Sequence, residues 1–167
     1  MAYIGLISDT HGYFDDKLRK FLEPVDVVWH AGDFGTGTVA QEIAAFKPLV
    51  GVCGNCDGYD VRSFHSGVES FEQDGMGVLM THIGGYPGHY DLRARRLIEM
   101  VRPQIFVCGH SHILKVVYDK YYDMMVLNPG ACGIEGFHVV RTALRFRIED
   151  GKLKDMEVGE WPKFTKS

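Results

Sequence analysis

Three short apolar runs in the first third of the chain, separated by two helix-like stretches, constrain its fold more than any other feature. The runs Tyr3–Ile7, Val25–Trp29 and Pro48–Cys53 have the length and composition of buried strands. Between them, Phe14–Leu22 repeats apolar residues at helical spacing, and Thr38–Phe46 is expected to form a second helix. Strands that alternate with helices predict parallel strands with the helices packed outside.

The remainder of the chain is richer in strands. Asp74-Gly75 predicts a hairpin turn, and Pro103 ends a helix predicted over Asp91–Val101. The strands expected here are Ser70–Gln73, Val78–Thr81, Ile105–Cys108, Leu114–Tyr118, Met124–Leu127 and Val139–Ile148. The simplest architecture is an α/β (α+β) fold of two packed mixed β-sheets flanked by helices, and 167 residues fit a single domain, 1–167.

Charge limits the partners that we expect. A formal net charge of −4 gives no basic field for a nucleic-acid polymer or an anionic membrane, so neither is expected as a partner. A small phosphoester stays compatible with this charge, because bound metal ions supply positive charge that the side chains lack. The sequence leaves a homo-oligomer open.

The sequence favours a cytoplasmic protein. The apolar N-terminal run is too short for a signal peptide, and no apolar run reaches the ~20 residues of a membrane helix. In the cytosol Cys53, Cys56, Cys108 and Cys132 are expected to be reduced thiols. Cys53-Gly54-Asn55-Cys56 has the spacing of a redox motif but lacks the thioredoxin-like context of one.

Residues that can bind metals follow the ends of five predicted strands. They are Asp9, His11, Asp33, Asn55, His82, His110 and His112. Loops at the carboxyl edge of such sheets converge on ligands. Asp9/His11 and His110/His112 are each two residues apart, and in an extended chain both members of such a pair point the same way. Each pair is therefore expected to hold one centre.

Seven nitrogen and oxygen donors are more than one catalytic ion takes while keeping an open position. They suit two ions that share a carboxylate, hold phosphoryl oxygens and lower the pKa of a bridging water. Each element also has an ordinary explanation: Asp33 as a helix cap, Asn55 as a turn residue, His110 and His112 as surface histidines. Their shared position at strand ends favours the metal site.

These residues, in this order, resemble the calcineurin-like metallophosphoesterase superfamily. The motifs are Asp9-Thr10-His11, Gly32-Asp33, Gly54-Asn55-Cys56-Asp57, a lone His82, Gly109-His110-Ser111-His112 and Asn128-Pro129-Gly130. The short chain looks most like the small single-domain bacterial and archaeal phosphodiesterases. The resemblance implies a four-layer αββα sandwich and a binuclear centre of two divalent metal ions, with manganese expected first and nickel, iron, cobalt or zinc as alternatives.

The resemblance also assigns roles. Asp9, His11 and His112 bind the first ion, Asn55, His82 and His110 bind the second, and Asp33 bridges both. The implied reaction is hydrolysis of a small phosphoester by attack of a metal-bridging hydroxide, with Asp33, Asn55 and His82 at its centre. His30 matches a histidine that is not a ligand, for which we expect a buried, hydrogen-bonded structural role.

The main departure from the family pattern is Cys56, which stands where members often have a histidine. A thiol is a weaker acid than imidazolium, so the site has no clear general acid and esters with poor leaving groups are disfavoured. Asp57 is then expected to brace its loop. His89 is either a substitute acid or a plain loop residue, and the Gly84–Gly88 segment is either a mobile lid or a turn.

Two alternatives to an enzyme remain from the sequence. The small retromer subunit of eukaryotes shares the implied fold and serves as an interaction module, so a non-catalytic scaffold is one. A metal-bound nucleotide sensor, which binds a phosphate ligand without turning it over, is the other. The sequence identifies neither the natural substrate nor the native metal.

Overall fold

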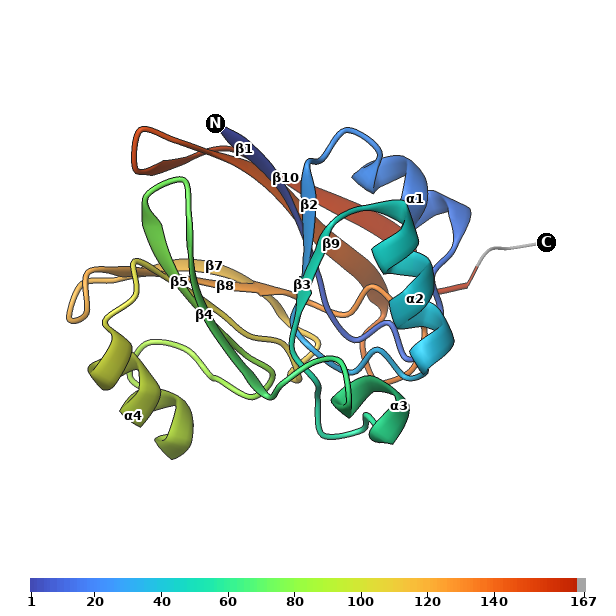
Figure 1. Ribbon diagram of the computed structural model, residues 1–167, viewed down its shortest axis with the longest axis horizontal. Helices are drawn as coiled ribbons and strands as arrows, with labels where there is room; N and C mark the ends of the chain where they lie inside the picture. The colour runs from blue at the N-terminus through green and yellow to red at the C-terminus, as the bar shows by residue number, and fades with distance from the viewer. Residues whose placement is uncertain (165–167) are drawn as a thin grey trace.

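Two five-stranded sheets packed face to face form the centre of the computed structural model, which describes residues 1–164. Figure 1 shows both sheets between helices. The first sheet has the order β10-β9-β1-β2-β3, and its strands are β1 (Ala2–Ile7), β2 (Val27–His30), β3 (Leu49–Gly51), β9 (Val140–Glu149) and β10 (Lys152–Pro162). Strands β1, β2 and β3 are parallel, whereas β9 and β10 are antiparallel to their neighbours.

The second sheet is also mixed and has the order β4-β5-β6-β8-β7. Its strands are β4 (Val68–Gln73), β5 (Met76–Thr81), β6 (Ile105–Val107), β7 (Leu114–Asp119) and β8 (Met124–Pro129). Strands β5, β6 and β8 are parallel, and β4 and β7 are antiparallel edge strands. The predicted turn at Asp74-Gly75 joins β4 to β5, which confirms the hairpin.

Successive side chains along each strand alternate between the core between the two sheets and the outer face that the helices cover. In β1, Ile4 and Leu6 pack between the sheets, whereas Tyr3 and Ile7 face the outer side, where α1 (Asp16–Leu22) and α2 (Gly37–Phe46) lie. On the second sheet, Leu79 packs outward against Ile98 of α4 (Leu92–Val101). Helices therefore cover both outer faces, and the expected four-layer αββα sandwich is confirmed.

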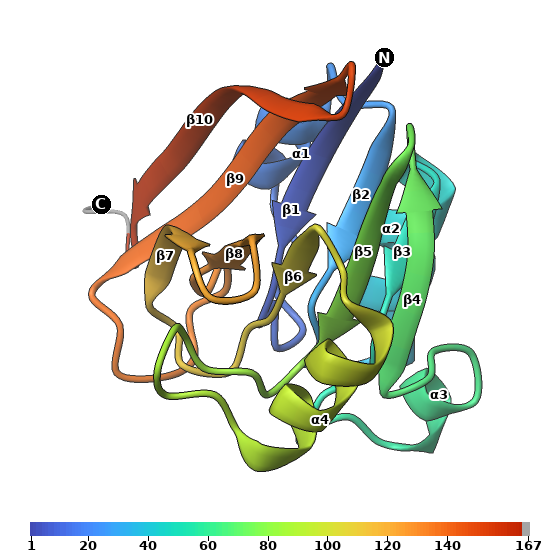
Figure 2. The same cartoon turned by 90° about the vertical axis from the view of Figure 1, so that its left-hand side faces the viewer.

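The polar loops that follow β1, β2 and β5 meet at one end of the molecule. Figure 2 shows the arrowheads of these three strands pointing to the same end. Two elements were not expected from the sequence: the short helix α3 (Tyr59–Arg62) and the edge strand β10. Strand β10 is mostly exposed and interrupted by a bulge between Lys154 and Glu157, so it lacks an apolar run or a clean alternation.

Helix starts follow side-chain caps. The α1 helix begins two residues later than the apolar pattern from Phe14 predicted, because the Asp15 carboxylate accepts a hydrogen bond from the Leu18 N–H and caps it. Thr36 caps α2 and Asp91 caps α4 in the same way.

All four cysteines are free thiols, as expected. Within residues 1–164, no helix is long and apolar enough to span a membrane.

Candidate metal centre

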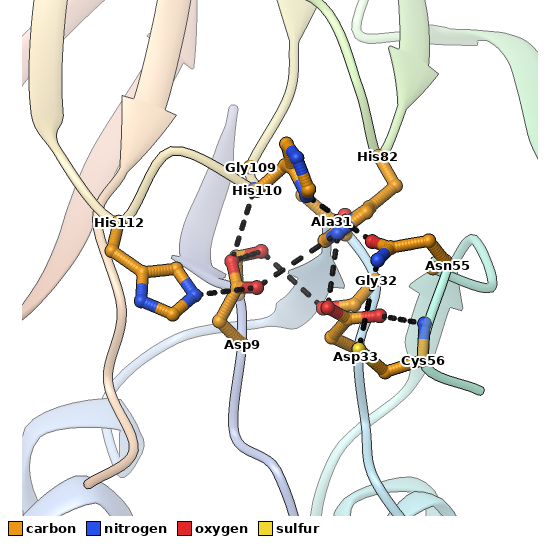
Figure 3. Close-up of polar contacts among 12 residues, drawn as sticks. Asp9, Ala31, Gly32, Asp33, Asn55, Cys56, His82, Gly109, His110 and His112 are labelled. Carbon is orange, nitrogen blue, oxygen red and sulfur yellow. Dashed lines mark hydrogen bonds and ion pairs between the residues drawn. The ribbon is translucent and has the colours of Figure 1, made fainter. Parts of the chain in front are cut away.

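The seven predicted donors converge where the loops after β1, β2, β3, β5 and β6 meet, and Figure 3 labels six of them, all but His11. Three sets of three have candidate ligand atoms that all lie within 4.8 Å of one another. The first is Asp9, His11 and His112, the second is Asp33, His82 and His110, and the third, which shares members with both, is His11, Asp33 and Cys56. Asn55 joins the second set, since its Oδ1 lies 3.1 Å from Nδ1 of His110. The first two sets, with Asn55, correspond to the two ion sets that the resemblance implies.

In both Asp9 and Asp33, one carboxylate oxygen accepts hydrogen bonds from neighbouring groups, and the other faces histidine rings. Asp9 Oδ2 accepts hydrogen bonds from the Ser8 hydroxyl at 2.6 Å and from the His110 backbone N–H at 3.2 Å. Asp9 Oδ1 lies 3.2 Å from Nε2 of His112 and 3.6 Å from Nε2 of His11. These contacts fix the plane of the carboxylate and leave one oxygen directed into the cluster.

The two carboxylate oxygens of Asp33 have the same two kinds of contact. Its Oδ1 accepts a hydrogen bond from the Cys56 backbone N–H at 2.9 Å. Its Oδ2 lies 3.1 Å from Nε2 of His82 and 3.6 Å from Nε2 of His11. One oxygen of Asp33 therefore faces a histidine from each of the first two sets.

Electrostatics keep both carboxylates ionised. Burial opposes ionisation of Asp9, but hydrogen bonds with His11, His112 and Ser8 more than offset it and hold the pKa well below its usual range. Burial also opposes ionisation of Asp33, and the contact with His82 again lowers its pKa. Two buried anions in one pocket are costly without cationic compensation.

The state of His82 tests whether the residues fit a metal. Its Nδ1 lies 2.7 Å from the Ala31 carbonyl oxygen, to which it donates a hydrogen bond, so in the neutral ring Nε2 carries a lone pair. That buried Nε2 makes no hydrogen bond within residues 1–164, although it faces Asp33 Oδ2. Burial opposes protonation of this ring, but the Asp33 and Asp9 carboxylates raise its pKa, so the space between Nε2 and Asp33 Oδ2 needs positive charge, either a proton on Nε2 or a divalent cation. The donor set therefore fits divalent cations.

Backbone geometry corrects one premise of the sequence analysis. Five donors adopt left-handed backbone conformations with φ of 57° at Asp9, 45° at His11, 58° at Asp33, 69° at His110 and 61° at His112. The two pairs are therefore not extended, and their side chains reach a common centre through tight turns. Such conformations are uncommon outside glycine, cost about 1–3 kcal/mol each and cluster at functional sites.

Two glycines allow these turns to approach one another. A Cβ atom at Gly54 would lie 2.1 Å from Asp33 Oδ1, and one at Gly109 would lie 2.1 Å from the Ser8 hydroxyl oxygen. Any side chain at either position would displace a carboxylate or its hydrogen-bond donor. The glycines are thus required by the close packing of the donor loops.

Two expected structural roles are confirmed. His30 is fully buried, its Nδ1 accepts a hydrogen bond from the Gly32 N–H, and its Nε2 lies 3.0 Å from the Thr10 hydroxyl. Burial lowers the pKa of His30 to about 3, so the ring is neutral. The Asp57 carboxylate braces its loop by accepting hydrogen bonds from four backbone N–H groups, those of Asp33, Phe34, Gly35 and Gly54.

Asn128 has a different setting from the one expected. The predicted strand Met124–Leu127 ended before Asn128, but this residue belongs to β8 and is buried. Its Nδ2 donates hydrogen bonds to the Gly109 carbonyl oxygen at 3.0 Å and the Ser111 hydroxyl at 3.1 Å. Asn128 therefore holds the turn that presents His110 and His112.

Sequence reasoning missed one wall of the site. A cavity of about 680 Å³ lies over the donors, and the segment 135–138 forms part of its lining. Glu135 Oε2 lies 3.6 Å from Nδ1 of His11, and the ring of His138 lies 5.1 Å from that of His112. Neither residue belongs to a recognisable motif. The only signal is the glycine pair at 133 and 136, which marks a loop beside His138.

Cys56 and His89 lie in different places. Cys56 lines the 680 Å³ cavity, and burial together with the Asp33 and Asp57 carboxylates raises the pKa of its thiol. His89 lines a separate cavity of about 380 Å³ and packs against Tyr86, with ring centroids 4.8 Å apart and the ring planes tilted by 40°. A role of His89 as a substitute acid stays a prediction.

Known proteins share sequence with this chain over most of its length. The profile of the calcineurin-like phosphoesterase superfamily domain matches residues 3–151. A probable metallophosphoesterase of Methanothermobacter thermautotrophicus is 29% identical over 140 residues, covering 77% of this chain and 76% of that protein. A phosphodiesterase of Methanocaldococcus jannaschii is 27% identical over 146 residues, covering 77% and 83%.

A solved structure extends the likeness in fold. Vps29 of Chaetomium thermophilum superposes with a TM-score of 0.75 over 96% of this chain and 97% of that one, at 13% identity. At that identity the likeness concerns the fold alone. The family profile spans nearly the whole chain, and on this ground the chain belongs to the calcineurin-like phosphoesterase superfamily.

Proposed function

We propose that this chain is a divalent-metal-dependent phosphodiesterase that hydrolyses a small phosphoester, and that residues 1–167 act as one catalytic domain. The observation that carries the proposal is the position of Asp33. Its Oδ2 faces Nε2 of His82 at 3.1 Å and Nε2 of His11 at 3.6 Å, as expected of a carboxylate shared by two ions. The phosphodiesterase relative of M. jannaschii supports the same reaction class.

In this proposal each of the two ions is bound by one set of clustered residues. Asp9, His11 and His112 hold one ion, Asn55, His82 and His110 hold the other, and Asp33 contacts both. When bound, the two ions supply positive charge for the phosphoryl oxygens and activate the attacking water. Manganese is our first candidate, and nickel, iron, cobalt or zinc suit the same nitrogen and oxygen donors.

The protein itself fixes geometry and limits proton transfer. Asp9, Asp33 and His82 are buried and held by neighbouring groups, so they define the site before substrate arrives. Asn55 and His110 are exposed in the cavity, where the substrate phosphate approaches. Cys56, whose raised pKa keeps the thiol protonated, is a weak proton donor. We therefore expect a preference for esters with acidic leaving groups.

The test is hydrolysis of bis(p-nitrophenyl) phosphate by metal-stripped protein that is re-supplied with manganese, nickel or zinc one at a time. We expect turnover that depends on metal and is lost in Asp33→Asn, which keeps the shape of the side chain but removes its charge. The metal content of both proteins is measured in parallel. Two bound ions without turnover on any tested phosphoester would reject the proposed reaction.

A second candidate is a non-catalytic scaffold. The observation that favours it is the likeness in fold to Vps29, together with a cysteine at position 56, where a proton-donating histidine would support catalysis. This candidate predicts metal binding with negligible turnover and a stable protein partner. The hydrolysis experiment separates the two candidates directly.

A further inference from the structure

A second cavity lies beside His110, which is the one member of the seven donors in its lining. It has a volume of about 380 Å³, and its lining includes Ile83, Tyr86, His89, Ser111, Ile113 and Lys115. His110 lines both this cavity and the larger one over the donors, so the two cavities share a wall at the candidate metal centre. A substrate whose phosphate lies at the donors can extend one substituent past His110.

We propose that this cavity is a subsite for an anionic group, a carboxylate or a second phosphate, on one substituent of the phosphoester, and that Lys115 binds it. The inference rests on the proposed function for the position of the reacting phosphate. It adds a substrate class: diesters in which a short apolar spacer links the phosphate to a second anion.

Lys115 supplies the positive charge. It projects from β7, is only partly exposed, and its Nζ lies 3.7 Å from the ring centroid of Tyr86. Across residues 1–164 it forms no ion pair with a carboxylate. The ring contact holds the ammonium in place but leaves its charge without an anionic partner, which an incoming carboxylate or phosphate would provide.

Ser111 supplies a directed donor. Its Oγ accepts hydrogen bonds from the Ile113 backbone N–H at 3.2 Å and from Asn128 Nδ2 at 3.1 Å. Both lone pairs of the hydroxyl are then occupied, and its proton is free to donate. Ser111 lines both cavities, so this proton is available at their junction.

One carboxylate, that of Asp91, also lines the cavity and would oppose an anion. Its Oδ2 accepts hydrogen bonds from the backbone N–H groups of Arg93 and Ala94 at the start of α4. Those bonds and the positive end of the helix compensate its charge. The remaining walls include Ile83, Ile113 and Tyr90, which favour an aromatic or alkyl spacer.

The experiment compares two non-hydrolysable ligands that differ by one carboxylate, phenylphosphonate and 4-carboxyphenylphosphonate. Their dissociation constants are measured by calorimetry on the manganese-loaded full chain. We expect the carboxylated ligand to bind roughly fivefold to tenfold more tightly, as for a charge-assisted contact in a partly solvated site. In Lys115→Met, which keeps most of the alkyl stem, this preference should disappear while phenylphosphonate affinity is unchanged.

Two variants serve as controls. Lys115→Arg should retain the preference because it retains the charge, and Lys120→Met should retain it because Lys120 is an exposed lysine outside the cavity. Manganese content is measured in every variant. Equal affinity for the two ligands in the unaltered protein, a preference that survives in Lys115→Met, or no binding of either ligand would each overturn the subsite. A Lys115-dependent preference in a protein without turnover would instead reject only the proposed reaction.

Discussion

The candidate site has two regions with opposite physical character. The floor, which we define as Asp9, Asp33 and His82, is almost fully buried, with exposed fractions of 0%, 2% and 4%. The rim, which we define as Asn55, Cys56 and His110, is exposed. Backbone groups and neighbouring side chains hold the floor in place, whereas the rim faces the cavity where substrate enters.

This difference separates two kinds of constraint. A change near the floor disturbs buried charges and the hydrogen bonds that hold them, so its effect should appear first in stability and metal binding. A change at the rim should leave the fold intact and alter which esters react.

The largest expected effect is that of Asp57→Ala beneath the floor. The substitution leaves three buried backbone N–H groups and one part-buried group without this acceptor, and at the low end of the range of about 1–3 kcal/mol for each buried group the cost is about 3 kcal/mol. We expect unfolding at a temperature lower by roughly 6–12 °C, which corresponds to about 3 kcal/mol in a chain of this size. Thermal unfolding followed by circular dichroism measures the shift.

Two matched variants sharpen this result. Asp57→Asn keeps one acceptor oxygen and should fall between Asp57→Ala and the unaltered protein. Glu42→Ala removes an exposed carboxylate on α2 and should stay within about 0.5 kcal/mol. A shift for Asp57→Ala no larger than that for Glu42→Ala would contradict the bracing role.

The next effect depends on pH. Asp15 lies 2.9–3.0 Å from the two terminal guanidinium nitrogens of the buried Arg141, whose Nε donates to the Cys132 carbonyl oxygen. Burial opposes ionisation of Asp15, but the Arg141 contact lowers its pKa below the reference value of 3.8. A lowered pKa in the folded state stabilises the protein above pH 3.8, and this contribution is lost as the pH falls through the folded-state pKa.

Asp15→Asn isolates this ion pair, because asparagine still caps α1. We expect the variant to be less stable by about 1.5–3 kcal/mol at pH 7 and to approach the stability of the unaltered protein in strong acid. Urea unfolding of both proteins across this pH range measures the difference. A difference that stays constant with pH would show that the charge of Asp15 contributes nothing.

At the rim, Cys56→His should raise turnover on esters with poor leaving groups by about tenfold, below the 10²–10⁴ that general acid catalysis typically supplies. Stability should change by less than about 0.5 kcal/mol, because position 56 is exposed. The measurement is the dependence of kcat/KM on leaving-group pKa across a series of aryl esters. An unchanged slope would mean that the new imidazole does not reach the leaving oxygen or that bond cleavage is not limiting.

The smallest effect is expected for the double variant Cys53→Ser/Cys56→Ser. Neither thiol belongs to the proposed ligand sets, so turnover of bis(p-nitrophenyl) phosphate should stay within about twofold. A collapse of activity with unchanged metal content would assign the thiols a chemical role and erase the distinction between floor and rim.

Much of the fold was predictable from local sequence, because buried strands and amphipathic helices leave periodic patterns. Tyr3–Ile7 was recognised on that basis and is part of β1. The edge strand β10 was not, since it is mostly exposed and broken by a bulge. The short helix α3 has only four residues, too few for a periodic signal.

The candidate donors were predictable for a different reason: they follow strand ends in a fixed order. Their backbone conformation was not, because left-handed turns at Asp9 and His110 arise from packing between loops. Glu135 and Lys115 reach the cavities from segments that carry no motif. Their position depends on how β7, β8 and β9 pack in the folded chain, and this packing cannot be predicted from local sequence patterns.

The left-handed backbone at five donor positions has a consequence for the evolution of this chain. Aspartate, asparagine and histidine are the non-glycine residues that tolerate this conformation best. They are also the residues that bind divalent cations through oxygen or nitrogen. A lineage that lost its metal would therefore still retain much of this residue set, because the turns require it. An intact motif in a distant descendant would then reflect the backbone conformation of the loops as much as metal binding.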